Sequence, residues 1–360
     1  SNPSLFMLST PGIGKSTLAR RMVLGLAGYG THSLILGDLK PDYVDLVEAM
    51  GGQVITLGPG RSTLNVLDRA AAVAAAQRMT GKFRRQVLGD SHARRVEMVV
   101  ALLNTWKGHP PPSEDRQVLD RALRVLDERT PGASPVLADL LGVITEGPDQ
   151  VRAVTLDDGD RHKYDAHTRR LRLDLTGILD GEMLGDMFSG QTTTPMRMDR
   201  SVAFDISALE AAPQATQAAA LLACWTYGFG NLAVAHALAD AGLEPYSPYL
   251  VVQDEIWRAL RMGEGMPDRF DTLARLNRTF GVGQILISHT MSDLLALPTE
   301  ADRAKTRGFV ERSGVVITGA LPRDEFENHL SDVLPYSEEE IALVSSWHTP
   351  PSWAQEGADM

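Results

Sequence analysis

A glycine-rich segment between an apolar strand and a helix constrains this sequence more than any other feature. The apolar run Leu5 to Leu8 precedes the segment, and a helical pattern follows it from Lys15 to Ala27. The segment itself is Ser9-Thr10-Pro11-Gly12-Ile13-Gly14-Lys15-Ser16-Thr17. A strand, a glycine-rich turn and a helix in this order are typical of a phosphate-binding loop, because backbone N–H groups of the loop and of the helix N-terminus can surround phosphate oxygens.

We expect this loop to bind ATP with Mg²⁺. Lys15 can bridge the outer phosphates and Ser16 can ligate the metal ion. The expected nucleotide contacts are Thr10, Pro11, Gly12, Ile13, Gly14, Lys15, Ser16 and Thr17. The segment departs from the usual pattern at its first position, where Ser9 replaces glycine. A side chain there can narrow the loop or force an altered backbone angle, and so change nucleotide affinity.

Polar residues follow two further apolar strands. Asp254 and Glu255 end the run that begins at Tyr249, and His289 follows the run 284–287. Two adjacent acids are commonly a solvated loop, but beside a phosphate-binding loop Asp254 can hold the magnesium shell and Glu255 can polarise an attacking water. His289 can sense the γ-phosphate through a neutral imidazole, or it can be structural.

The order of the elements predicts an α/β fold with a parallel sheet. Strands alternate with helices at both ends of the chain, whereas the middle shows only helical periodicity. The predicted strands are 5–8, 33–38, 53–57, 201–206, 249–252, 284–287 and 314–318, and the helices of the second half include 215–229 and 267–279. We therefore expect a core of residues 3–66 and 198–348, an all-helical insertion of residues 67–197, and a flexible tail of residues 349–360.

Composition and charge exclude some classes of protein. The chain is 43% hydrophobic and 22% charged, as expected of a folded, soluble protein, and its single cysteine, Cys224, lies in an apolar helical run. A net charge of −11 gives no support for general nucleic-acid binding. The apolar stretch 215–237 is interrupted by polar residues and indicates a buried helix and its end. Ser1-Asn2 resembles an expression scar, which suggests a piece of a longer protein.

An ordered set of short motifs resembles the conjugation and type IV secretion ATPases, the VirB/TraC class of the FtsK/HerA superfamily. Asp254-Glu255-Ile256-Trp257 resembles the Asp-Glu-Ala-Trp signature of that class. Further similar segments, in order, are 38–43, Gly51-Gly52, 64–68, 188–190 and 204–206. At Ser288-His289 the class usually has Thr-Gln, so His289 replaces a glutamine.

The resemblance implies a RecA-like ATPase with a mostly parallel sheet flanked by helices and an inserted all-α subdomain. It also implies a ring, commonly a hexamer, at the cytoplasmic face of a secretion channel, with the membrane reached through channel proteins or a missing N-terminal part. Ring motors of this kind often use an arginine from the neighbouring subunit, because charge develops on the γ-phosphoryl group during transfer. Arg278 and Arg275 are our candidates, followed by Arg307 and Arg312.

Two alternatives remain open from the sequence. A DNA pump of the FtsK type is the alternative within the superfamily, and a nucleotide-binding scaffold with little hydrolysis is suggested by Ser9 and His289. Arginines cluster in the helical insertion at Arg84-Arg85, Arg94-Arg95 and Arg169-Arg170 with Arg172. A solvated helix face is their default explanation, and contact with DNA or a partner protein is the alternative.

Overall fold

The computed structural model describes residues 4–261, 266–268, 270–271 and 281–347. Its strands are β1 (Ser4–Leu8), β2 (His32–Asp38), β3 (Gln53–Thr56), β4 (Val202–Asp205), β5 (Tyr249–Gln253), β6 (Gly283–Ser288) and β7 (Val315–Thr318). Its helices are α1 (Lys15–Ala27), α2 (Val44–Ala49), α3 (Ala70–Arg78), α4 (Gly81–Lys107), α5 (Ser113–Arg129), α6 (Leu137–Glu146), α7 (Asp149–Arg152), α8 (Arg161–Asp180), α9 (Glu182–Phe188), α10 (Gln214–Asp240), α11 (Ile256–Arg261), α13 (Met291–Leu295), α14 (Glu300–Glu311), α15 (Arg323–Glu325) and α16 (Glu338–Ser345). Short 3-10 and π turns lie at Ser207–Leu209 and Phe326–Leu330.

The chain divides into two compact units. The terminal unit comprises Ser1–Ser33 with Pro248–Met360, and the central unit comprises Leu34–Ser247. The core and insertion predicted from the sequence were defined by where strands and helices occur. The two compact units are defined by contacts between residues, so the two divisions are not equivalent. The predicted boundaries therefore stay a prediction.

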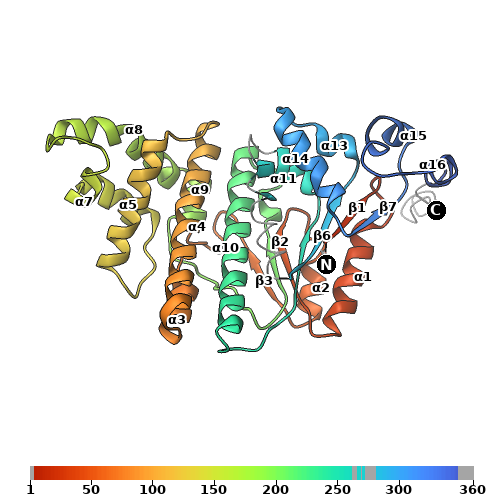
Figure 1. The fold of residues 1–360 in the computed structure, drawn as a ribbon, viewed down its shortest axis with the longest axis horizontal. Coiled ribbons are helices and arrows are strands. Elements are labelled where there is room, and N and C mark those ends of the chain that lie inside the picture. The colour runs from red at the N-terminus through yellow and green to blue at the C-terminus, as the bar shows by residue number, and fades with distance from the viewer. Residues whose placement is uncertain (1–3, 262–265, 269, 272–280, 348–360) are drawn as a thin grey trace. The chain divides into compact units, whose positions relative to one another are not determined.

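The terminal unit contains four parallel strands in the order β5-β6-β1-β7, of which Figure 1 labels β6, β1 and β7. Strands β5 and β6 are almost continuously buried and rich in Val, Ile and Leu, as is typical of parallel strands covered on both faces. Leu8 of β1 lies opposite Ser288 of β6, and Gln253 of β5 lies opposite Leu286. The register therefore brings the carboxyl ends of β1, β5 and β6 to one edge of the sheet.

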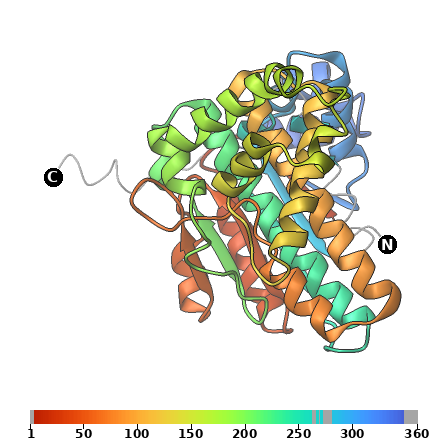
Figure 2. The ribbon, with the colours of Figure 1, turned by 90° about the vertical axis from the view of Figure 1, so that its left-hand side faces the viewer.

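The central unit contains the parallel strands β3-β4-β2 and most of the helices. Helices α3 to α9 lie between β3 and β4 in the sequence. Figure 2 shows the two long helices α4 and α10 side by side, and α3 packs on both. Small residues permit this close approach: Ala72, Ala75 and Ala76 of α3 pack against Val234 and Leu238 of α10.

Helix α10 is longer than predicted. The sequence suggested an end near Phe229, but the helix continues without a break through Gly228 and Gly230 to Asp240. Packing explains the first glycine, because a Cβ on Gly228 would lie 2.5 Å from Cδ2 of Leu36. By length and composition α10 could span a membrane, but 72% of its most apolar stretch is buried within the protein, as in a core helix.

The predicted fold class is confirmed. Every strand pairing that the structure describes is parallel, and an all-helical segment is inserted between two strands of a RecA-like α/β fold. The predicted burial of Cys224 is also confirmed, and burial raises the pKa of its thiol. Most of the predicted helix 267–279 and the predicted flexible tail lie outside the described residues.

Candidate nucleotide-binding site

The glycine-rich loop joins β1 to α1, and the residues expected to contact the nucleotide lie in this loop and in the first turn of α1. Gly12 and Gly14 have φ angles of 83° and 93°, in the left-handed region where a side chain is strained. Gly14 is the N-cap of α1, no side chain caps the helix, and its first turn carries no acidic residue. The N–H groups at this helix end are therefore not neutralised by a nearby carboxylate of the first turn, which suits an anion.

Lys15 reaches back along the loop. Its Nζ donates to the backbone oxygen of Ser9 at 2.6 Å and to that of Thr10 at 3.0 Å. These contacts hold the ammonium group over the loop that was predicted to surround the phosphates. A positive charge at this position supplies what the outer phosphates of a nucleotide require.

Ser9 lies in the loop without a left-handed backbone angle, since the described non-glycine residues with positive φ are Leu156, Asp158 and Glu255. The effect of its side chain on nucleotide affinity stays a prediction. Ser9 is buried, and its Oγ donates to the backbone oxygen of Ala320 at 3.3 Å. A Cβ on the neighbouring Gly319 would lie 2.5 Å from that Oγ. Because Gly319, the residue after β7, has no side chain, it leaves room for the side chain of Ser9.

Ser16 and Asp254 form a hydrogen bond at the N-terminus of α1. The Ser16 Oγ donates to Asp254 Oδ2 at 2.8 Å, and the backbone N–H of Glu255 donates to Asp254 Oδ1 at 2.8 Å. Hydroxyl and carboxylate oxygens suit Mg²⁺, which commonly takes few protein ligands and completes its shell with phosphate oxygens and water. The described residues contain no cluster of three or more His, Cys, Asp or Glu able to hold a metal, and a magnesium site of this kind needs none.

Glu255 is held from several sides. Its side chain is 17% exposed, and its φ of 52° lies in the left-handed region. Trp257 Nε1 donates to Oε2 at 2.7 Å, His289 Nε2 lies 3.1 Å from Oε1, and Arg258 Nε lies 3.5 Å from Oε2. Because an ionised carboxylate only accepts, His289 donates through Nε2. The structure therefore brings His289 to the predicted water-activating carboxylate.

Two arginine side chains pack on the indole ring of Trp257 and hold it in place. The guanidinium of Arg261 lies 4.8 Å from the centre of the indole ring, and that of Arg258 lies 5.3 Å from it. Arg261 in turn donates to the backbone oxygen of Asp293 at 2.9 Å and to its Oδ1 at 3.0 Å. Sequence reasoning treated Trp257 only as part of a signature and missed Arg261. The spacing of Trp257, two residues after Glu255, was the available signal.

The arginines proposed to act between subunits are only partly placed. Arg275 and Arg278 lie outside the described residues. Arg312 donates from Nη2 to Asp271 Oδ1 at 3.1 Å and lies over the ring of Phe309. Arg307 is half-buried on α14, and its Nε has no hydrogen-bond partner among the described residues.

The arginine pairs of the helical insertion fall into two groups. Arg84, Arg85, Arg169 and Arg170 are exposed, as expected of a solvated helix face. Arg94 and Arg95 depart from that expectation. Arg95 is 4% exposed and forms two hydrogen bonds with Asp127, at 2.9 and 2.6 Å, whereas Arg94 lines a pocket that is described below.

Comparison with known proteins gives structural matches. No family model and no curated protein sequence matches the chain. VirB4 of Thermoanaerobacter pseudethanolicus matches with a TM-score of 0.68 and 16% identity, over 95% of this chain and 83% of that one. The bacterial conjugative coupling protein TrwB, in a trigonal form with sulphate, matches with a TM-score of 0.52 and 13% identity, over 90% of this chain and 72% of that one.

A further structure of TrwB was solved with the non-hydrolysable ATP analogue ADPNP. It matches with a TM-score of 0.50 and 15% identity, over 85% of this chain and 69% of that one. At these identities the matches establish the fold. The fold implied by the resemblance of the short motifs is therefore confirmed: the chain shares the fold of VirB4 and of the conjugative coupling protein TrwB.

Proposed function

We propose that this chain is an ATP-hydrolysing motor domain of a conjugative or type IV secretion system. One observation carries the proposal: Ser16 at the head of an uncapped helix donates to Asp254, and the next residue, Glu255, is held at the same edge of the sheet. A helix end that favours phosphate, a pair of oxygens that favours Mg²⁺ and a carboxylate that can take a proton are what phosphoryl transfer to water requires.

Each residue has a distinct part in the proposed reaction. The backbone of Thr10 to Thr17 binds the phosphates, and Lys15 neutralises charge on the outer ones. Ser16 and Asp254 hold Mg²⁺, which when bound offsets the charge that develops on the phosphates. Glu255 orients the attacking water and accepts its proton. His289 and Trp257 position the Glu255 carboxylate through the contacts at 3.1 and 2.7 Å.

The test is ATP hydrolysis by the purified protein, with Lys15→Ala as the variant and Lys82→Ala as the control. Lys82 is exposed on α4 in the central unit and has no part in the proposed site. Loss of two charge-assisted hydrogen bonds to phosphate is expected to weaken ATP binding by roughly a hundredfold or more. Unchanged nucleotide affinity in Lys15→Ala would remove the assignment of the loop.

Turnover with and without double-stranded DNA separates the two motor hypotheses. The net charge of −11 favours secretion over general DNA binding. Strong stimulation by DNA would instead support a DNA pump of the FtsK type. A protein that binds ATP but does not hydrolyse it under any of these conditions would be a nucleotide-binding scaffold.

We further propose that the motor works as a hexameric ring on the cytoplasmic side of the cell membrane, with secretion-channel proteins as partners. The proposal rests on the ordered set of short motifs that resembles the conjugation and type IV secretion ATPases. An arginine supplied by the neighbouring subunit would make turnover depend on protein concentration. If Arg278 is that residue, inactive Arg278→Ala and inactive Glu255→Gln proteins should regain activity when mixed, because a mixed interface has both residues intact. Complete absence of rescue in mixed rings seen by native mass spectrometry would reject Arg278.

A further inference from the structure

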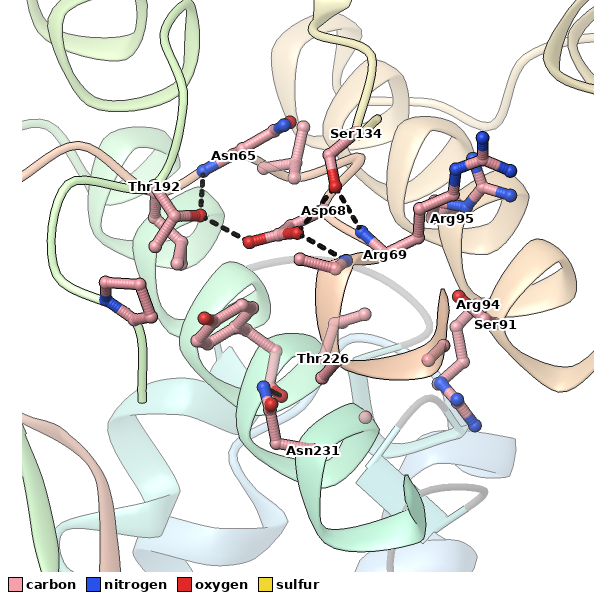
Figure 3. A pocket seen from close by; sticks show the side chains of 18 of the residues that line it. Asn65, Asp68, Arg69, Ser91, Arg94, Arg95, Ser134, Thr192, Thr226 and Asn231 are labelled. Atoms are coloured by element: carbon pink, nitrogen blue, oxygen red, sulfur yellow. Dashed lines mark hydrogen bonds between the residues drawn. The ribbon is translucent and has the colours of Figure 1, made fainter. Parts of the chain in front are cut away.

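The central unit contains a pocket of about 630 Å³ that the proposed ATPase reaction does not use. Such a volume lies in the range of small-molecule sites. Figure 3 shows Ser91, Arg94 and Arg95 of α4 on one side, Asn65 and Thr192 on the other, and Thr226 and Asn231 of α10 below. The apolar part of its wall comes mainly from Val66, Ala72, Met98, Ala223 and Val234.

Arg94 is the unusual residue of this pocket. It forms no hydrogen bond or ion pair within the part of the chain that the structure describes. Burial lowers the pKa of its guanidinium, although the charge of Asp90 one turn earlier on α4 raises it. A Cβ on Gly230 would lie 3.4 Å from Arg94 Nε, so the side chain lies against α10. The guanidinium is half-buried and the charge of Asp90 offsets only part of its cost of burial, so a bound anion would add the direct ion pair that it lacks.

The other charged residues of the wall are already paired. Asp68 accepts from Ser134 Oγ and Thr192 Oγ1, each at 2.8 Å (Figure 3), and from the backbone N–H of Ala70 at 2.9 Å. Arg69 and Arg95 both bind Asp127, which lies outside the pocket. Three arginines and one aspartate line the wall, so the field in the pocket favours a negative ligand, and Arg94 is the one of them with a free guanidinium.

We propose that this pocket binds a small amphipathic organic anion, with its carboxylate, sulfonate or phosphate group on Arg94 and its apolar body against Ala72, Met98 and Val234. Thr226 and Asn231 on α10 offer polar atoms beside the anionic group. The site lies wholly within the central unit and uses none of the residues proposed for ATP hydrolysis. The inference therefore stands or falls independently of the proposed motor function.

The experiment compares two probes that differ by one charged group. 8-Anilinonaphthalene-1-sulfonate carries a sulfonate on an aromatic body, and N-phenyl-1-naphthylamine has the same body without it. Binding of each to the whole protein is measured by fluorescence and calorimetry. We expect one molecule of the sulfonate per chain, bound at least several-fold more tightly than the neutral amine, because only the sulfonate can pair with Arg94.

Two variants and one control locate the probe. Arg94→Gln should weaken sulfonate binding by roughly tenfold to a hundredfold, the value of one charged hydrogen-bond pair, and leave the neutral amine unchanged. Arg84→Gln, an exposed arginine on the same helix, should change neither. Ala71→Trp, at an exposed position on the wall, should fill the pocket and abolish binding of both probes. Equal sulfonate affinity in Arg94→Gln, or unaffected binding in Ala71→Trp, would overturn the proposal.

Discussion

Glu255 in the terminal unit and Asp127 in the central unit are both carboxylates held by several donors, but their partners come from different distances along the chain. Two partners of Glu255, Trp257 and Arg258, lie within three residues of it on the same short helix. Asp127 on α5 receives two hydrogen bonds from Arg95 on α4 and an ion pair from Arg69 at 2.9 Å. Glu255 has one distant partner, His289, in addition to its two local ones, whereas both arginines bound to Asp127 come from other segments.

The difference indicates which carboxylate can change its contacts during function. Burial alone raises the pKa of Asp127, but hydrogen bonds from His92 and Arg95 and the charges of Arg95 and Arg69 outweigh it, so that the pKa lies well below its ordinary value. Releasing Asp127 would leave two buried arginines without a carboxylate partner. Releasing Glu255 breaks the local contacts with Trp257 and Arg258 and one contact with another segment, that with His289. We therefore expect substitutions at the two sites to affect different measurements.

The largest expected effect is that of Glu255→Gln on catalysis. The amide keeps the shape of the side chain but cannot accept a proton, so hydrolysis should slow by roughly 10²–10⁴. ATP binding and the free energy of unfolding should stay close to those of the wild type. Single-turnover hydrolysis, ATP titration and urea unfolding measure the three quantities. A native hydrolysis rate in this variant would mean that another group activates the water. A large loss of stability would mean that Glu255, like Asp127, has a structural role.

Asp127→Ala should give the opposite pattern. Breaking the pairs with Arg69 and Arg95 is expected to lower the free energy of unfolding by roughly 3 kcal/mol. Nucleotide affinity should hardly change. Glu97→Ala is the matched control, because its ion pair with Arg116 is exposed and such pairs contribute little. Loss of ATP binding without loss of stability in Asp127→Ala would contradict the structural role.

Acid unfolding gives a second test of the contribution of Asp127 to stability. A carboxyl group whose pKa is depressed in the folded state stabilises the protein fully above its unfolded pKa of about 3.9, and the contribution is lost as the pH falls below that value. The wild type should therefore lose stability on acidification more steeply than Asp127→Ala. Parallel acid-unfolding curves for the two proteins would show that Asp127 is not responsible.

Trp257→Phe should have a smaller effect, confined to catalysis. The substitution keeps an aromatic ring for Arg261 but removes the indole N–H that donates to Glu255 at 2.7 Å. A poorly positioned carboxylate is expected to lower the hydrolysis rate by roughly tenfold, with little change in ATP affinity. Trp106→Phe, on α4, serves as the control. Equal hydrolysis rates in Trp257→Phe and Trp106→Phe would mean that Trp257 contributes only to packing.

The smallest effect is expected from His289→Gln. Glutamine is the residue usual in the class that the sequence resembles, and its amide can donate to Glu255 much as the imidazole does at 3.1 Å. The rate should stay within about threefold of the wild type, whereas His289→Ala, which removes the donor, should lose more. Hydrolysis assays of both variants decide the matter. An equal loss of hydrolysis rate in His289→Gln and His289→Ala would mean that the imidazole itself is needed.

The terminal unit shows how much of the site the sequence could predict. The loop residues Thr10 to Thr17 are contiguous, so their pattern alone located the site, and the strands around them fixed Asp254 and Glu255 at the same edge. The contact between His289 and Glu255 was not foreseen, because it depends on the register of β6. The role of Gly319 was also invisible, since it comes from a segment about three hundred residues away from Ser9 in the chain.

The central unit was harder to predict in detail. Its helical character followed from periodicity, but α3 was not singled out within it as a separate helix. The glycines of α10 were interpreted as the end of a helix, although packing against Leu36 requires Gly228 within it. Arg69, Arg95 and Asp127 come from separate segments with no characteristic spacing, and only the folded chain brings them together.

The contact between Ser9 and Gly319 restricts the order in which these two positions can change during evolution. A Cβ at position 319 would lie 2.7 Å from the Cβ of Ser9, so alanine at 319 and serine at 9 are mutually exclusive without a backbone shift. A lineage that gained Ser9 must already have had glycine at 319, and it cannot lose that glycine until position 9 reverts. Homologues should therefore show the two positions varying together, with alanine at 319 confined to chains that keep the loop's usual glycine.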